Sequence, residues 1–81
     1  MYESLIGENV SVIVSSRGEK VLEYIGVLSS ESEDTIVLSN VDVFYLTKVS
    51  YAYGSREEVQ KFKSNMRKAI INKKYIISCD K

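Results

Sequence analysis

The stretch Val21-Leu-Glu-Tyr-Ile-Gly26-Val-Leu28 is an apolar segment with a glycine inside it, and it decides the fold. A glycine weakens the interior of a strand unless the strand must bend sharply or another backbone must come close. One apolar run precedes this segment over residues 10–14, and another follows it from Thr35 to Val43. Three consecutive strands with the middle one bent at Gly26 predict a very small sheet that curls into a barrel.

The two ends of the chain add a helical turn and a hairpin. Residues 2–7 predict a short helical turn that ends at Gly7, since glycine suits the position after a helix. Two short apolar runs surround a polar turn over residues 69–79, which is typical of a hairpin. The expected fold class is therefore mainly β: a small, strongly bent five-stranded barrel with a short N-terminal helix. The whole chain, 1–81, is one domain at this length.

The segment between the third strand and the final hairpin predicts an inserted helix. Residues 47–54 alternate in polarity and indicate another strand or an extended arm. Ser55 and Glu58 then have the spacing of a capping box. Val59, Phe62 and Met66 follow at helical spacing, so we expect a helix near 55–67.

Composition excludes several classes of site. Cys79 is the single cysteine and there is no histidine, so neither a disulfide framework nor a metal cluster is expected, and we expect no cofactor. Cys79 itself is expected to be a small buried hydrophobe. No long apolar stretch predicts a signal peptide or a membrane span, so we expect a soluble cytoplasmic protein. A small all-β chain without cross-links often gains buried area by forming oligomers.

The formal net charge of zero hides a strong asymmetry. Residues 1–42 carry two basic and eight acidic side chains, a net charge of −6. Residues 43–81 carry nine basic and three acidic side chains, a net charge of +6. The asymmetry indicates an acidic and a basic face or head-to-tail self-association, unless the two surfaces are merely solvated and happen to differ.

The order of these elements resembles the Sm and Sm-like (LSm) family, whose members form bent five-stranded barrels that assemble into rings. The first family motif corresponds to residues 8–42, and the second, a hairpin over 68–79, corresponds to Ile71-Asn-Lys-Lys-Tyr-Ile76. The insertion between them, about 47–66, is longer than the usual link. The first motif is carried by Val10, Val12, Gly26, Leu28, Ile36, Leu38 and Asn40.

The resemblance implies a single-stranded RNA site at the pore of a ring, but this chain departs from the family pattern there. Asp34 and Thr35 stand where RNA-binding members have Met-Asn, and Asn72-Lys73 replaces Arg-Gly. The candidate RNA-binding residues are therefore Asp34, Thr35, Asn72, Lys73 and Lys74, expected to be neighbours. Each also has a plainer interpretation, as a turn or strand-start residue, and the acidic loop before Thr35 repels phosphate.

The insertion offers a second candidate surface. Tyr51, Tyr53 and Lys61 belong to a segment in which aromatic and basic residues alternate, a composition that suits single-stranded nucleic acid. The same aromatic residues would equally suit the cover of the barrel or a subunit interface.

No enzyme chemistry is indicated, because there is no histidine, no base beside Cys79 and no glycine-rich phosphate loop. We expect a non-catalytic ring protein that binds single-stranded RNA or acts as a scaffold in RNA metabolism. The alternative is a protein-interaction or assembly ring that has lost the RNA pocket. Either ring would form through the strands near Arg67–Ile71 and Tyr75–Cys79, as the family resemblance implies.

Overall fold

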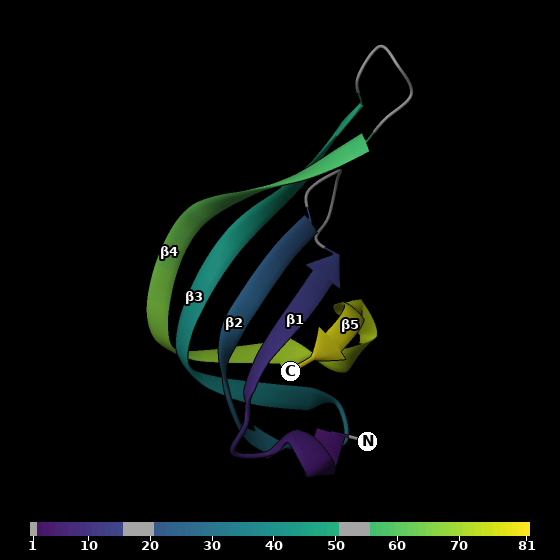
Figure 1. Cartoon of the computed structure of the whole chain (residues 1–81). Helices are drawn as coiled ribbons and strands as arrows, with labels where there is room; N and C mark the ends of the chain where they lie inside the picture. The colour runs from purple at the N-terminus through teal and green to yellow at the C-terminus, as the bar shows by residue number, and fades with distance from the viewer. Residues whose placement is uncertain (1, 16–20, 51–55) are drawn as a thin grey trace.

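Five antiparallel strands form one sheet in the computed structural model, which describes residues 2–15, 21–50 and 56–81, without the side chains of 47–50 and 56–59 (Figure 1). The order of strands across the sheet is β4-β3-β2-β1-β5. The mainly-β fold class and the short N-terminal helical turn are both confirmed. The elements are η1 (Tyr2–Leu5), β1 (Asn9–Ser15), β2 (Val21–Glu31), β3 (Thr35–Ser50), β4 (Arg56–Asn72), η2 (Lys73–Tyr75) and β5 (Ile76–Asp80).

The helix expected near 55–67 is wrong, because β4 begins at Arg56 and continues as a strand to Asn72. β4 pairs with β3 over that whole length, from Ser50 opposite Arg56 to Thr35 opposite Asn72. Strand pairing with a long, β-branched and aromatic neighbour overrides the helical spacing of the sequence. β2 begins opposite Leu46 of β3, and past this point β3 and β4 continue together as a two-stranded arm (Figure 1). The expected hairpin turn at Arg17-Gly18 lies outside the described residues.

At Gly26 the backbone of β3 lies so close to β2 that it leaves no room for a side chain, as the sequence indicates. A Cβ added to Gly26 would lie 2.9 Å from the carbonyl oxygen of Ser39 and 3.2 Å from that of Asn40. The pairing of β2 with β3 shifts here between Ile25 and Val27, and Asn40 has a positive φ of 52°. A bulge of this kind bends a strand and increases its twist. The sheet therefore curls at this point.

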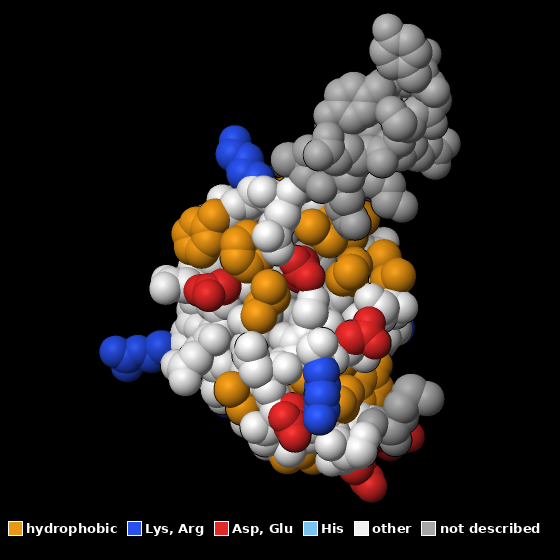
Figure 2. All heavy atoms as spheres, viewed as in Figure 1, with side chains coloured by type: hydrophobic (Ala, Val, Ile, Leu, Met, Phe, Trp, Pro, Cys, Tyr) orange, Lys and Arg blue, Asp and Glu red, His pale blue; other side chains and the backbone are white. Residues whose placement is uncertain are grey.

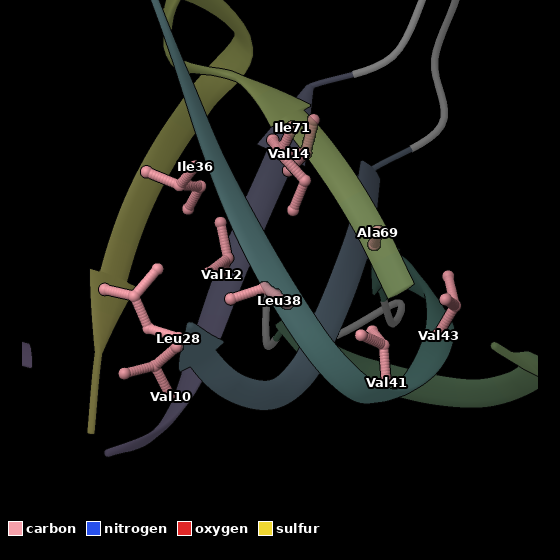
Figure 3. Close-up of a cluster of buried hydrophobic side chains, with 10 residues drawn as sticks. All are labelled: Val10, Val12, Val14, Leu28, Ile36, Leu38, Val41, Val43, Ala69 and Ile71. Atoms are coloured by element: carbon pink, nitrogen blue, oxygen red, sulfur yellow. The ribbon is translucent and has the colours of Figure 1, made fainter. Parts of the chain in front are cut away.

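The curled sheet encloses a core whose buried members, among the described residues, are all aliphatic (Figure 3). They come from four strands, and those of β1 alternate with outward-facing residues, as a sheet with one buried face requires. Tyr2 and Leu5 of η1 pack against the same core, as does Cys79 of β5, which is half-buried. The core residues are Val10, Val12, Val14, Leu28, Ile36, Leu38, Val41, Val43, Ala69 and Ile71.

The helical turn η1 is fixed to the end of β2 by backbone hydrogen bonds. The Gly7 N–H donates to the Leu28 carbonyl at 2.7 Å, and the Leu28 N–H donates to the Glu8 carbonyl at 3.0 Å. Gly7 has a φ of +89°, a conformation that glycine adopts without strain. Gly7 thus takes the role that the sequence predicts, and the chain reverses there into β1.

Substituting Gly26 by valine should lower the free energy of unfolding by about 1–3 kcal/mol, because the new side chain meets the β3 backbone at Ser39 and Asn40 as well as the Val41 side chain, and the backbone cannot move aside cheaply. Urea denaturation followed by circular dichroism measures the change. Ser30→Val is the matched control: it adds a branched side chain at an exposed position of the same strand and should change stability by less than about 0.5 kcal/mol. Equal effects of the two substitutions would contradict the role of Gly26.

Candidate functional site

The loop between β2 and β3 lies against the η2 turn, so the five candidate RNA-binding residues are neighbours. Thr35 begins β3 directly opposite Asn72, the last residue of β4. The Lys73 N–H donates a hydrogen bond of 2.8 Å to the Asp34 carbonyl. The expectation that Asp34 and Thr35 adjoin the 72–74 turn is therefore confirmed by the strand register. We call this group, with Glu31 and Tyr2, the turn cluster.

Thr35 already uses its polar groups within the loop. Its carbonyl accepts from the Ser32 N–H at 2.8 Å, and its N–H donates to the Ser32 hydroxyl at 3.2 Å. The two hydroxyl groups are 2.7 Å apart and share a hydrogen bond. The hydroxyl therefore closes the tight loop and has little left to offer a ligand.

Asn72 is likewise engaged in local structure. Its side-chain oxygen accepts from the Lys74 N–H at 3.0 Å and so caps the first turn of η2. Capping by asparagine satisfies a backbone donor that a helix start otherwise leaves open. The ammonium group of Lys74 lies 5.0 Å from the centre of the Tyr75 ring, and both side chains are exposed. Lys74 is thus the solvent-facing cation of the turn.

Lys73 is held by two groups that the sequence does not single out as its partners. Its ammonium group lies 2.7 Å from a carboxylate oxygen of Glu31 at the end of β2. The same group lies 5.2 Å from the centre of the Tyr2 ring in η1, within the range of a cation–π interaction. Lys73 therefore ties the η2 turn to both β2 and η1, and its charge is neutralised inside the chain.

The electrostatics of the turn cluster do not favour a phosphate group. Counted together with Glu33 of the adjoining loop, the cluster has three acidic residues (Glu31, Glu33 and Asp34) against two basic ones (Lys73 and Lys74), which gives a net charge of −1. Glu33 and Asp34 are exposed, so their charges face the solvent beside the turn. A polyanion approaching the turn would meet repulsion from the loop and only one unpaired cation.

Of the residues singled out in the second candidate surface, Lys61 is the one that the structure describes. Tyr51 and Tyr53 lie outside the described residues. Lys61 is exposed on β4, opposite Tyr45, and the ammonium group of its neighbour Lys63 lies 5.9 Å from the Tyr45 ring centre. The basic and aromatic character expected of the insertion is thus carried by β3 and β4 themselves.

Cys79 has no features of a reactive thiol. Burial, with the nearby Asp80 carboxylate as a smaller cause, raises the pKa of the Cys79 thiol above its ordinary value. A raised pKa leaves less of the nucleophilic thiolate at neutral pH. In the described part of the chain, no three histidine, cysteine or acidic residues come together as a metal site. Among those residues there is also no helix of the length and hydropathy needed to cross a bilayer.

Comparison with known proteins adds no relative: no family description, curated protein or solved structure matches this chain.

The ion pair in the turn cluster should stabilise the fold measurably. A double-mutant cycle with Lys73→Met, Glu31→Gln and the combined variant should give a coupling energy of about 0.5–1 kcal/mol, because both side chains are partly shielded from solvent. The coupling should shrink in 1 M NaCl, where charges are screened within about 3 Å. Urea denaturation of the four proteins gives the value. A coupling of zero at low salt would contradict the interpretation of Lys73 as an internal tether.

Proposed function

We propose that this chain is a non-catalytic assembly module of the Sm-like kind, which associates head to tail into a ring. One observation supports the proposal most directly: the sheet ends at β4 on one side and at β5 on the other. Each of these edge strands carries a strongly exposed aliphatic residue, Ile70 on β4 at 66% exposure and Ile77 on β5 at 60%. Two different open edges, each with an exposed aliphatic side chain, suit pairing between copies of the chain.

Edge strands favour pairing between copies because an open strand edge presents unpaired N–H and C=O groups as well as side chains. When β4 of one copy pairs with β5 of the next, both kinds of edge are satisfied by a single repeated contact. Such a contact joins different surfaces of the two copies and produces a closed ring if the rotation between copies closes. Five-stranded sheets with an order ending in β4 and β5 are also what the family resemblance implies.

The turn cluster supports an assembly role over RNA binding at the pore. In a ring of the expected kind the η2 turn would face the centre, but Lys73 there is paired with Glu31 and the adjoining loop is acidic. RNA binding remains the second candidate function. It is favoured by a different observation, the exposed basic side chains of β4.

Sedimentation equilibrium at 10–100 μM tests the assembly. The wild-type protein should have the mass of several chains, each of 9.2 kDa. Ile70→Lys and Ile77→Lys should each weaken association at least about tenfold, because a buried apolar contact becomes a buried charge. Both positions are exposed in the single chain, so the variants should stay folded.

Ile6→Lys is the control, since Ile6 is an exposed aliphatic residue of the N-terminal segment rather than of an edge strand. It should leave the mass unchanged. A wild-type protein that sediments at 9.2 kDa over the whole concentration range would overturn the proposed assembly.

A further inference from the structure

The middle of the sheet presents a row of side chains on its outer face, away from the core. Ile13 lies between the buried Val12 and Val14 of β1, so its side chain points outward. Residues paired directly across neighbouring strands point to the same side of a sheet. The strand register therefore carries the row from β1 across β2 and β3 to β4. We call it the outer row; its members are Ile13, Glu23, Phe44 and Phe62.

Two flanking rows extend the same face along the strands. Val21 pairs with Leu46 on one side of the outer row. Ile25 pairs with Asp42 on the other side. On β2, Val21, Glu23 and Ile25 thus stand in line, an acid between two aliphatic residues, and their side chains are about 7 Å apart along the strand. All three are partly exposed, so the face offers both apolar surface and a carboxylate to a partner.

Two phenylalanine rings lie beside that carboxylate. Phe44 is the direct partner of Glu23 in the strand register, and Phe62 follows on β4. The two rings meet edge to face, with centroids 5.7 Å apart and an interplanar angle of 77°. Phe62 is 58% exposed, so Phe44 supports it on one side while most of it stays open to solvent. An aromatic face next to a carboxylate attracts cations, since each of the two groups favours positive charge.

The carboxylate of Glu23 is positioned by two neutral donors. It accepts hydrogen bonds from the Ser11 hydroxyl and from the Gln60 side-chain amide. Neither donor cancels its charge, and the two ion pairs found among the described residues do not include it. A carboxylate can accept about four hydrogen bonds, so acceptor capacity remains. Glu23 is thus fixed in orientation and still able to pair with a cation.

The outer row and its flanking rows have an acidic character. Over β2, β3 and β4 they contain two carboxylates and neither lysine nor arginine. Lys61 is opposite Tyr45, which points to the other face from Phe44, and the Lys63 ammonium group also lies at the Tyr45 ring. Figure 2 shows, over these strands, hydrophobic side chains on both sides of acidic ones, with cationic side chains at the margin. The face is therefore complementary in charge to a basic partner.

Edge-to-edge assembly would leave this face uncovered. Pairing of β4 with a neighbouring β5 extends the sheet in its own plane, through backbone groups at the edges. The side chains of the outer row stand roughly perpendicular to that plane. The outer face therefore does not rest on the proposed assembly, and it is a different part of the chain from the turn cluster.

We propose that the outer row and its flanking rows dock an extended segment of a partner protein in which an arginine stands between two aliphatic residues, two positions from each. The guanidinium group pairs with Glu23 and lies against the adjoining phenylalanine rings. The aliphatic residues pack on Val21 and Ile25, because extended chains on both sides have the same two-residue spacing. Arginine suits this place better than lysine, since its planar group can bind a carboxylate through two hydrogen bonds and stack on an aromatic ring.

Nuclear magnetic resonance titration of the isotope-labelled chain with the nonapeptide Leu-Ser-Arg-Ser-Leu-Ser-Arg-Ser-Leu tests the proposal. The peptide should bind with a dissociation constant below about 1 mM at about 50 mM NaCl. The amide signals of Ile13, Glu23 and Phe44 should move, and those of the turn cluster should not. A peptide with glutamine in place of both arginines should bind at least about fivefold more weakly, and one with lysine at least about twofold more weakly.

Substitutions in the chain should identify the same groups. Glu23→Gln should weaken binding of the arginine peptide at least about fivefold and change that of the glutamine peptide less than about twofold. Glu33→Gln removes an exposed acid from the loop between β2 and β3; it is the matched control and should change binding less than about twofold. Phe62→Leu keeps apolar surface without the ring and should weaken binding of the arginine peptide about threefold. Thermal melts establish that each variant is folded.

Several results would overturn the docking site. Among them are outer-row signals that stay fixed at about 2 mM peptide, equal affinity of the arginine and glutamine peptides, and equal effects of the Glu23 and Glu33 substitutions. Movement of the Ile70 or Ile77 signals instead would assign the peptide to a sheet edge, and a lower sedimentation mass of Phe62→Leu without peptide would assign the face to a second copy. Ile77→Lys, which should weaken assembly, should keep the peptide affinity of each chain, so failure of assembly and failure of docking are told apart.

Discussion

The close approach of β2 and β3 at Gly26 is the constraint on which the rest of this structure depends. No side chain fits there, because the Ser39 carbonyl would lie 2.9 Å from a Cβ. The bend produced by Gly26 and the bulge at Asn40 brings the aliphatic residues on both sides of it into one interior. Among the described residues this interior holds ten buried aliphatic side chains, and they meet because the sheet bends.

The sequence predicts this part of the fold well, because a glycine inside an apolar strand indicates a sharp bend or a close backbone approach, and Gly26 has both. The segment after it shows the limit of local patterns. Residues 56–67 contain good helix formers and a helix-capping spacing, but β3 extends to Ser50 and offers a long unpaired edge that β4 covers. A helix there would leave the N–H and C=O groups of that edge unpaired. The free-energy cost depends on where β3 ends, and the local pattern of residues 56–67 does not reveal that.

The candidate site was predictable in its placement and unpredictable in its chemistry. The meeting of Thr35 and Asn72 could be expected from their positions in the motifs, although the final segment is no paired hairpin: β4 pairs with β3 and β5 pairs with β1. The partners of Lys73 could not, because they depend on where η1 docks. Hydrogen bonds between Leu28 and the residues around Gly7 place Tyr2 beside the turn, and only then does its ring reach the Lys73 ammonium group.

The charge asymmetry of the sequence acquires a structural meaning from these contacts. The acidic half forms η1, β1, β2 and the first part of β3, and it supplies Glu31 to neutralise Lys73. The basic half includes four exposed cations of β4 that take part in neither ion pair found among the described residues: Lys61, Lys63, Arg67 and Lys68. Positive charge is thus cancelled where the chain folds against itself and retained where the sheet is open. That distribution leaves β4, rather than the turn cluster, as the more positively charged part of the described sheet.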